Sequence, residues 1–200
     1  MKSHKRKVGN GINGSPGARV RRVAPGSSGL GTPGPLRSSS SESPGVGRGR
    51  KGQMFRVGTL NVGTMTGRGM EVVTMMEKRR VRILCVQEVR WRGKGVKMLG
   101  NGYKMFYVGE KSGRNGVGIV VEESLVDSVV EVIEYSSRLM MVKLCWEGIG
   151  VNVVSAYGPQ AGLGGEVRDE FWEEFDELLG KLGSGEKVVI GGSKWACGEE

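Results

Sequence analysis

The feature that most constrains the fold is a short apolar run that breaks abruptly onto polar residues, at residues 81–91 (VRILCVQEVRW). Its centre, residues 83–86, is continuously apolar, which is typical of a strand buried on both faces of a sheet. Glu88 follows, so its carboxylate is predicted to stand where the strand leaves the core. That position suits Mg²⁺, which takes carboxylate oxygens and retains several waters. The alternative is an ordinary solvated glutamate, and this stretch alone favours that alternative.

Two further apolar runs also end on a polar side chain. Residues 55–61 (FRVGTLN) end on Asn61, and residues 150–157 (GVNVVSAY) end on Tyr157, which Gly158 and Pro159 follow. Three buried strands that each deliver one polar side chain at an end form the pattern of a functional site. Together they favour the site interpretation of Glu88 over the solvated one.

The first quarter of the chain differs sharply in composition from the rest. Residues 1–51 hold eleven Lys and Arg against one Glu, a net charge of +10, so the remaining residues carry −1 of the total of +9. Residues 1–52 contain five of the six prolines and no Phe, Trp, Tyr or Cys. Such a segment cannot bury enough apolar surface to offset its ordering entropy, so residues 1–52 are predicted to be a disordered basic tail.

Short basic runs within this tail suggest two uses. The run that contains Lys5, Arg6 and Lys7 could attract a nucleic-acid phosphate backbone or serve in nuclear import. A solvated linker that merely keeps the chain soluble is an equally good interpretation.

The cysteines and the hydropathy pattern limit the cellular compartments in which the protein is expected. Three cysteines lie far apart without a CxxC spacing, and the basic start of the chain is followed by glycines and not by an apolar stretch. No run approaches the ~18 apolar residues of a membrane span. We therefore expect a nuclear or cytoplasmic protein that is neither secreted nor bound to a membrane, and a monomer by default.

From residue 54 onward the sequence alternates strands and helices. Residues 69–80 are predicted to form a helix with Met70, Val73 and Met76 packed in the core, and residues 90–100 a basic, glycine-rich loop. Asn115 and Gly116 are predicted to make a tight hairpin turn between strands at 103–108 and 116–122.

The second half continues in the same way. Strands are predicted at 126–135, 139–146 and 151–157, then an amphipathic helix at 166–182 with an acidic solvated face, and a buried strand at 187–190. Hairpins that alternate with strand–helix–strand units indicate an α/β sandwich with mixed sheets.

At these residues the sequence resembles a known family. The likeness rests on six stretches, which follow in this order: Leu60-Asn61, Gln87-Glu88, NGVGIVV (115–121), SRLMMVKL (137–144), SAYGPQ (155–160) and VVIGG (188–192). This ordered set resembles the endonuclease/exonuclease/phosphatase superfamily. The helix ending in MMEKRR and the Arg90-Trp91 pair after Glu88 look most like the endonuclease domains of LINE-type retrotransposons and the craniofacial-development-protein-2-like proteins.

The resemblance implies a fold, a cofactor and roles for individual residues. It implies a four-layer α/β sandwich with mixed sheets at residues 54–192, and a Mg²⁺-dependent phosphodiesterase that acts on DNA. Asn61 would lie beside the metal and the scissile phosphate, Glu88 would ligate Mg²⁺ (or Mn²⁺), and Tyr157 would place its phenol against the phosphate. Arg90 and Trp91 would contact nucleic acid, by resemblance only.

The pattern then departs from the family. The next family motif is Gly-Asp-x-Asn, but here Ser193 stands at the Asp position and Trp195 at the Asn position. A serine hydroxyl is not a base at neutral pH. The family's later Asp-His pair has no counterpart, since the one histidine is His4.

These departures lead us to expect an incomplete domain. The sequence is therefore interpreted as a C-terminally truncated domain at 54–192 with a divergent end at 193–200, which binds its metal weakly and whose catalysis is impaired. The strand at 187–190 would then lack neighbours and leave an exposed edge.

Three other interpretations stay open at this point. The chain could be a non-catalytic nucleic-acid-binding protein that works through its basic tail, and its binding would then be salt-sensitive and independent of sequence. It could be a truncated product without a stable fold. Within the superfamily, a lipid or inositol-phosphate phosphatase is the rival to a nuclease.

Overall fold

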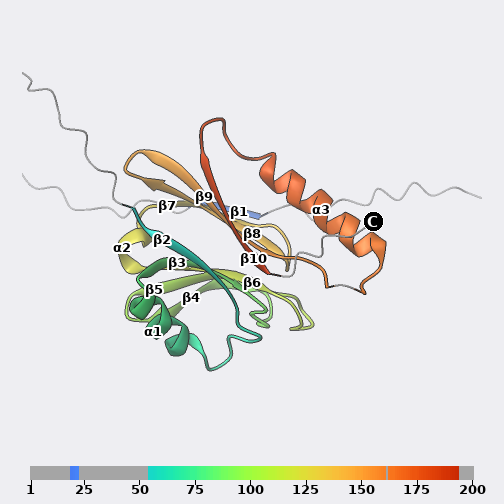
Figure 1. Cartoon of the computed structure of the whole chain (residues 1–200), viewed down its shortest axis with the longest axis horizontal. Coiled ribbons are helices and arrows are strands. Elements are labelled where there is room, and N and C mark those ends of the chain that lie inside the picture. The colour runs from blue at the N-terminus through green and yellow to red at the C-terminus, as the bar shows by residue number, and fades with distance from the viewer. Residues whose placement is uncertain (1–18, 23–53, 161, 194–200) are drawn as a thin grey trace, which may run out of the picture.

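The computed structural model describes residues 19–22, 54–160 and 162–193, which form two five-stranded sheets and three helices (Figure 1). No helix in these ranges is long and apolar enough to cross a membrane.

The first sheet is built from a continuous part of the chain. Its spatial order is β2 (Arg56–Asn61), β3 (Val81–Gln87), β6 (Val117–Val121), β5 (Tyr103–Val108) and β4 (Lys94–Gly100). The strands β2 and β3 are parallel because α1 (Gly69–Arg79) carries the chain back between them, while the other neighbours are antiparallel. This mixed pattern agrees with the prediction.

The second sheet joins distant parts of the chain. Its order is β1 (Arg19–Arg22), β7 (Val129–Glu134), β8 (Leu139–Trp146), β9 (Ile149–Tyr157) and β10 (Lys187–Ser193). The short helix α2 (Glu123–Val126) leads from the first sheet into β7, and α3 (Gly165–Leu179) connects the parallel strands β9 and β10.

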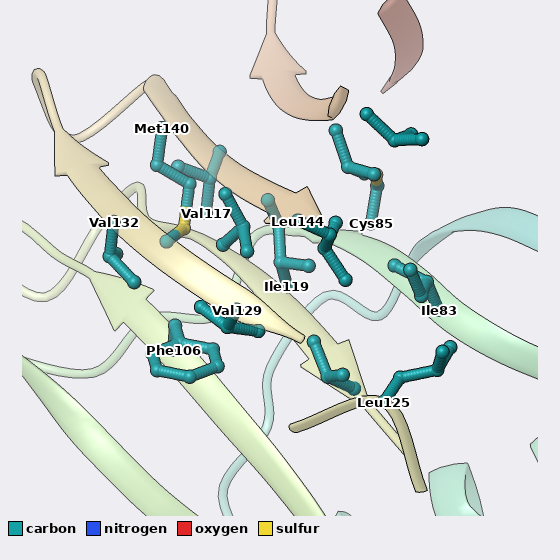
Figure 2. Close-up of a cluster of buried hydrophobic side chains, with 14 of the residues drawn as sticks. Ile83, Cys85, Phe106, Val117, Ile119, Leu125, Val129, Val132, Met140 and Leu144 are labelled. Atoms are coloured by element: carbon teal, nitrogen blue, oxygen red, sulfur yellow. The ribbon is translucent and has the colours of Figure 1, made fainter. Parts of the chain in front are cut away.

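Three apolar clusters hold four layers together. The central cluster lies between the sheets and joins Ile119 and Phe106 to Met140 and Leu144 (Figure 2). A second cluster seats α1 on the outer face of the first sheet, and a third seats α3 on the second sheet. The two helices therefore cover opposite outer faces (Figure 1). The predicted four-layer sandwich is confirmed.

A glycine sets how closely the sheets approach near one edge. A Cβ built on Gly191 of β10 would lie 2.6 Å from the Cβ and 2.8 Å from the Sγ of Cys85, and 3.2 Å from the Cβ of Thr59. Contacts this short do not occur between real side chains, so β10 can lie over β2 and β3 only with glycine at this position. Cys85 itself is fully buried, as predicted.

Two local predictions in the first sheet are wrong. Residues 94–100 are not a loop but strand β4, because pairing with β5 gives its backbone partners despite the glycines and lysines. The connection between β5 and β6 spans residues 109–116, so it is not a tight turn. Gly116 does adopt a positive φ, 118°. The side chain of Asn115 donates a hydrogen bond to Glu110 within this longer loop.

The buried face of α1 and the start of β7 also differ from the prediction. Met70 is 50% exposed, and Val72 takes its place in the core beside Val73 and Met76. The helix is therefore rotated relative to the predicted stripe. Residue 126 belongs to α2 and not to a strand.

The ends of the chain test the remaining fold predictions only in part. Of the predicted disordered tail, residues 19–22 form β1, which differs from the prediction, and residues 1–18 and 23–52 lie outside the described residues. Among the described strands, β10 pairs with β9 alone, and its Val188 and Ile190 are 38% and 44% exposed. β10 extends to Ser193, beyond the predicted end at residue 190.

Candidate active site

Three of the predicted site residues meet at one end of the sandwich. Asn61 is the last residue of β2, Glu88 follows the last residue of β3, and Tyr157 is the last residue of β9. The Asn61 amide donates to Oε1 of Glu88 at 2.9 Å, and the Tyr157 hydroxyl donates to the same oxygen at 3.0 Å. The chain thus brings together the three strand-end side chains that the sequence singled out.

Glu88 is buried, not solvated. The residue is 8% exposed, which excludes the alternative of an ordinary strand-end glutamate. Its φ is 58°, a left-handed conformation that is uncommon for any residue other than glycine. The turn is held because the next amide, of Val89, donates to the carbonyl of Gly116 at 3.0 Å. A strained backbone that aims a buried carboxylate is typical of a functional site.

Arg90 supplies the positive charge beside this carboxylate. Its Nη2 lies 2.9 Å from Oε2 of Glu88, and its side chain is 51% exposed. Arg90 also has a positive φ, 56°, and its amide donates to the carbonyl of Asn115 at 3.0 Å. The guanidinium therefore both neutralises Glu88 and reaches solvent at the surface of the site.

Two residues that were not singled out from the sequence support Tyr157. The Gln160 amide donates to the Tyr157 hydroxyl at 3.1 Å. The Arg138 guanidinium lies 5.2 Å from the centre of the Tyr157 ring and donates to the carbonyls of Tyr157 and Gly158 at 3.2 and 3.4 Å. Both residues fall inside the SAYGPQ and SRLMMVKL stretches, so their motif membership was the available signal.

A buried polar chain beneath the site fixes β3 against β9. Gln87 is fully buried, accepts a hydrogen bond from the Thr59 hydroxyl at 3.3 Å, and donates to the Ser155 hydroxyl at 3.3 Å. Ser155 in turn donates to the carbonyl of Val86 at 3.2 Å. Because buried polar groups cost free energy unless they are paired, this chain favours one relative placement of the two sheets. It thereby sets the distance between Glu88 and Tyr157.

The other predicted site residues lie elsewhere or outside the described residues. Trp91 packs edge-on against Tyr107 with Lys97 over its ring, in the cluster that seats α1. It is therefore part of the core beneath α1 more than of a binding surface. Lys5, Arg6 and Lys7 are not among the described residues.

Ser193 occupies the register position beside Tyr157. In the parallel pairing of β9 and β10, Ser193 is the partner of Tyr157. The backbone of Ser193 therefore lies at the same end of the sandwich as Asn61 and Glu88.

A Mg²⁺ ion would find one carboxylate here. Within the described residues, no three acidic, histidine or cysteine side chains converge. Both oxygens of Glu88 accept hydrogen bonds, and the Oδ1 of Asn61 accepts one from the Gly63 amide at 3.1 Å. Mg²⁺ commonly binds through one or two carboxylates together with substrate phosphates and waters. The donors fit a Mg²⁺ ion that Glu88 and the amide oxygen of Asn61 would hold weakly.

Exposed cations lie at the same end of the first sheet as this site. The loop after β3, the start of β4 and the loop after β5 form a basic rim that we define as Arg90, Arg92, Lys94, Lys111 and Arg114, all exposed. The two loops are tied together, since the Gly109 amide donates to the carbonyl of Gly93 at 2.7 Å. A fixed group of cations beside a buried carboxylate suits an anionic ligand such as a phosphate chain.

No family model matches the chain. A search of curated proteins finds craniofacial development protein 2 of Bos taurus, 28% identical over 128 residues, which cover 62% of this chain and 21% of that protein. The chain therefore spans about a fifth of that relative.

Solved structures with the same fold include two endonucleases and a protein bound to a DNA product. The endonuclease domain of TRAS1, a telomere-specific non-LTR retrotransposon, gives a TM-score of 0.51 at 18% identity, covering 70% of this chain and 58% of that one. The AP endonuclease LMAP from Leishmania major gives a TM-score of 0.53 at 15% identity, covering 69% of this chain and 54% of that one. D. rerio TDP2 in complex with a single-strand DNA product gives a TM-score of 0.51 at 11% identity, covering 69% of this chain and 59% of that one. At these identities the likeness establishes the fold.

Proposed function

We propose that this chain, which has the fold of the endonuclease/exonuclease/phosphatase superfamily, is a Mg²⁺-dependent phosphodiesterase domain of the LINE-retrotransposon type. Its substrate would be DNA, and its turnover would be slow. The observation that carries the proposal is the buried carboxylate of Glu88, held by Asn61 and Tyr157 at the end of three strands. The exposed basic rim beside it supports a polyanionic substrate over a small phosphate ester.

Each side chain has a defined task in this proposal. Glu88 and Asn61 would hold the metal, which when bound polarises phosphoryl oxygens and stabilises the charge that develops on them. The Tyr157 hydroxyl would donate to a phosphate oxygen in place of Glu88, and Gln160 would keep the phenol oriented. Arg90, half exposed, would turn from Glu88 to the phosphate backbone.

Ser193 explains why the reaction would be slow. It lies in register with Tyr157, at the strand end where the resemblance places an Asp that orients or deprotonates the attacking water. Loss of a general base lowers a rate by ~10²–10⁴-fold. The proposed site would therefore bind a metal and a phosphate but lack the general base for the attacking water.

Nicking of supercoiled plasmid with Mg²⁺ or Mn²⁺ tests this proposal directly. The wild-type chain is expected to nick slowly, Ser193→Asp to nick faster, up to ~10²-fold, and Glu88→Gln to lose nicking in both backgrounds. Ser193→Ala is the matched control and should leave the slow rate unchanged. The proposal fails if Glu88→Gln leaves the nicking unaltered. It also fails if neither the wild-type chain nor Ser193→Asp nicks plasmid with either Mg²⁺ or Mn²⁺.

The presence of serine at position 193, where the resemblance places an Asp, also favours a second function, the non-catalytic binding of nucleic acid. That function predicts a chain that binds DNA tightly at low salt yet never nicks it, even after Ser193→Asp. Binding that vanishes when residues 1–52 are deleted would then assign the affinity to the basic tail.

A further inference from the structure

A hollow lies at the end of the sandwich that is opposite to the candidate active site. It has a volume of about 480 Å³ and is formed where α1 ends, where β3 and β5 begin and where β6 leads into α2. We call it the α1–β5 pocket, and its lining includes Glu77, Arg80, Arg82, Tyr103, Glu122 and Glu123. Arg82 precedes Glu88 by six residues, so the two lie roughly 20 Å apart along β3.

The side chain of Tyr103 lines this pocket and is almost entirely buried. The residue is 5% exposed, and its ring packs in the cluster that seats α1 on the first sheet. Its hydroxyl forms no hydrogen bond with any of the described residues. A polar group buried this deeply usually has a partner, because an unmade hydrogen bond costs free energy. The phenol therefore supplies one recognition group for a ligand in the pocket.

Two of the charges in the pocket cancel each other. The Arg82 guanidinium forms an ion pair with Glu122 and donates to the Ser124 hydroxyl at 2.7 Å. It also lies 5.3 Å from the centre of the Trp146 ring, which is the distance of a cation–π contact. Arg82 is thus held by three groups of the protein and is engaged before any ligand arrives.

The remaining charges are mainly negative. Glu77 accepts a hydrogen bond from the neutral amide of Asn101 at 3.0 Å. The carboxylate of Glu123 lies where a Cβ on Gly102 would stand. The ion pairs among the described residues include neither of these glutamates. Arg80, exposed at the C-cap of α1, offsets one charge, but the C-terminal end of the helix adds partial negative charge.

The environment of the phenol agrees with this balance. Burial raises the pKa of the Tyr103 phenol, and the carboxylates of Glu122 and Glu77 raise that pKa further, while the Arg82 cation lowers it. Carboxylates therefore outweigh cations at the hydroxyl, and the phenol stays protonated at neutral pH. Its oxygen can accept a hydrogen bond from a cationic donor.

We propose that the α1–β5 pocket binds an aliphatic ammonium or guanidinium group, which donates to the Tyr103 hydroxyl oxygen and pairs with Glu77 and Glu123. An anionic group would be repelled there, and an apolar group would desolvate the carboxylates without compensation. An ammonium group is about the size of a water molecule, ~30 Å³, so the pocket has room for the alkyl chain that carries it. A free polyamine and a lysine or arginine side chain present this same chemistry. The binding needs none of the residues of the proposed function.

NMR titration of the full chain with putrescine, a four-carbon diamine, tests the site at constant ionic strength. Amide signals of residues 77–82, 101–103 and 122–124 are expected to shift saturably, whereas those of Asn61, Glu88 and Tyr157 should not. The uncharged diol of the same chain length should shift neither set. The proposal is overturned if the diol acts like the diamine, if putrescine gives no saturable shift, or if inorganic phosphate shifts the first set in place of putrescine.

Conservative variants test the individual groups. Tyr103→Phe keeps the ring and should lower the affinity for putrescine about tenfold or more, because it removes a hydrogen bond to a charged group. Tyr107→Phe is the control, since Tyr107 lies on the same strand but packs against Trp91. Equal affinities of the two variants would overturn the role of the phenol.

A second pair of variants does not depend on a core position. Glu123 is exposed, so Glu123→Gln should leave the fold intact and weaken putrescine binding. Glu110→Gln removes the same charge from the loop after β5, at the active-site end, and should leave the affinity unchanged. Equal effects of the two would mean that only overall charge attracts the amine, which would overturn a defined site.

The two sources of the cation are distinguished by a third ligand. Lysine with its amino and carboxyl groups capped presents the ammonium as a partner protein would. Tighter binding of capped lysine than of putrescine supports the pocket as a site for a lysine side chain, and the reverse supports a free amine. Binding of neither overturns the proposal.

Discussion

Removal of the Tyr157 hydroxyl should reveal how strongly Glu88 is held. Tyr157→Phe keeps the ring, its burial and its stacking with Arg138, and deletes only the donor that lies 3.0 Å from Oε1 of Glu88. A hydrogen bond to a charged group contributes ~1.5–3 kcal/mol. Gln160, which also loses a partner, is exposed and can bond to water instead. We therefore expect the free energy of unfolding at neutral pH to fall by ~1.5–3 kcal/mol.

Urea unfolding of a double-mutant cycle measures this interaction. The cycle comprises the wild type, Tyr157→Phe, Glu88→Gln and the double variant, and the coupling between the two positions should exceed ~1 kcal/mol. Gln160→Ala is the control, because it removes a solvated partner and should change stability by less than ~0.5 kcal/mol. A coupling near zero would mean that the short contact between phenol and carboxylate contributes nothing, and the reasoning about the site geometry would be refuted.

The remaining predictions concern the contact between the sheets. Gly191→Ala should destabilise the fold by ~1–3 kcal/mol in urea unfolding, because its Cβ would overlap Cys85. The control is Gly165→Ala in the first turn of α3, where no atom lies within 4 Å of the new Cβ and alanine suits a helix, so this change should not destabilise. Equal losses of stability in the two variants would contradict this. Burial raises the pKa of the Cys85 thiol to about 12, so a thiol reagent should modify exposed Cys145 and spare Cys85 in the native chain. Since the unfolded thiol ionises near pH 8.5, the stability that this burial gives is complete below about pH 8.5 and declines as pH rises toward 12. Cys85→Ala should remove that part of the pH dependence of unfolding, and an unchanged dependence would contradict the assignment.

The sequence predicts best where local pattern and tertiary burial agree. The run at 83–86 is apolar because β3 is covered on both faces, and three strand ends indicated Asn61, Glu88 and Tyr157 before any geometry was known. The structure places Asn61 and Tyr157 each within hydrogen-bonding distance of Glu88. Their catalytic roles stay a prediction.

The parts that the sequence did not predict depend on contacts between distant residues. Strand β4 has weak strand propensity and forms because β5 offers an edge. Arg138 supports Tyr157 from nineteen positions away through a bond to a backbone carbonyl, and apart from its place in the SRLMMVKL stretch nothing in the sequence indicated this contact. The left-handed backbone of Glu88 is equally invisible, because it follows from hydrogen bonds that tie its turn to the loop after β5.

The order of the strands has a consequence for how the chain acquires its structure during synthesis. The first sheet uses only residues 56–121, so all its partners are available as soon as this part has left the ribosome. The second sheet pairs Arg19 with Glu134, and it needs β10, near residue 190, to cover β2 and β3. Such long-range pairings are slow because loop closure precedes the contacts that stabilise it. The inner face of the first sheet therefore stays uncovered until β7, β8 and β9 arrive, and its part at β2 and β3 until β10 arrives. During this interval the exposed apolar surface makes the nascent chain prone to aggregation.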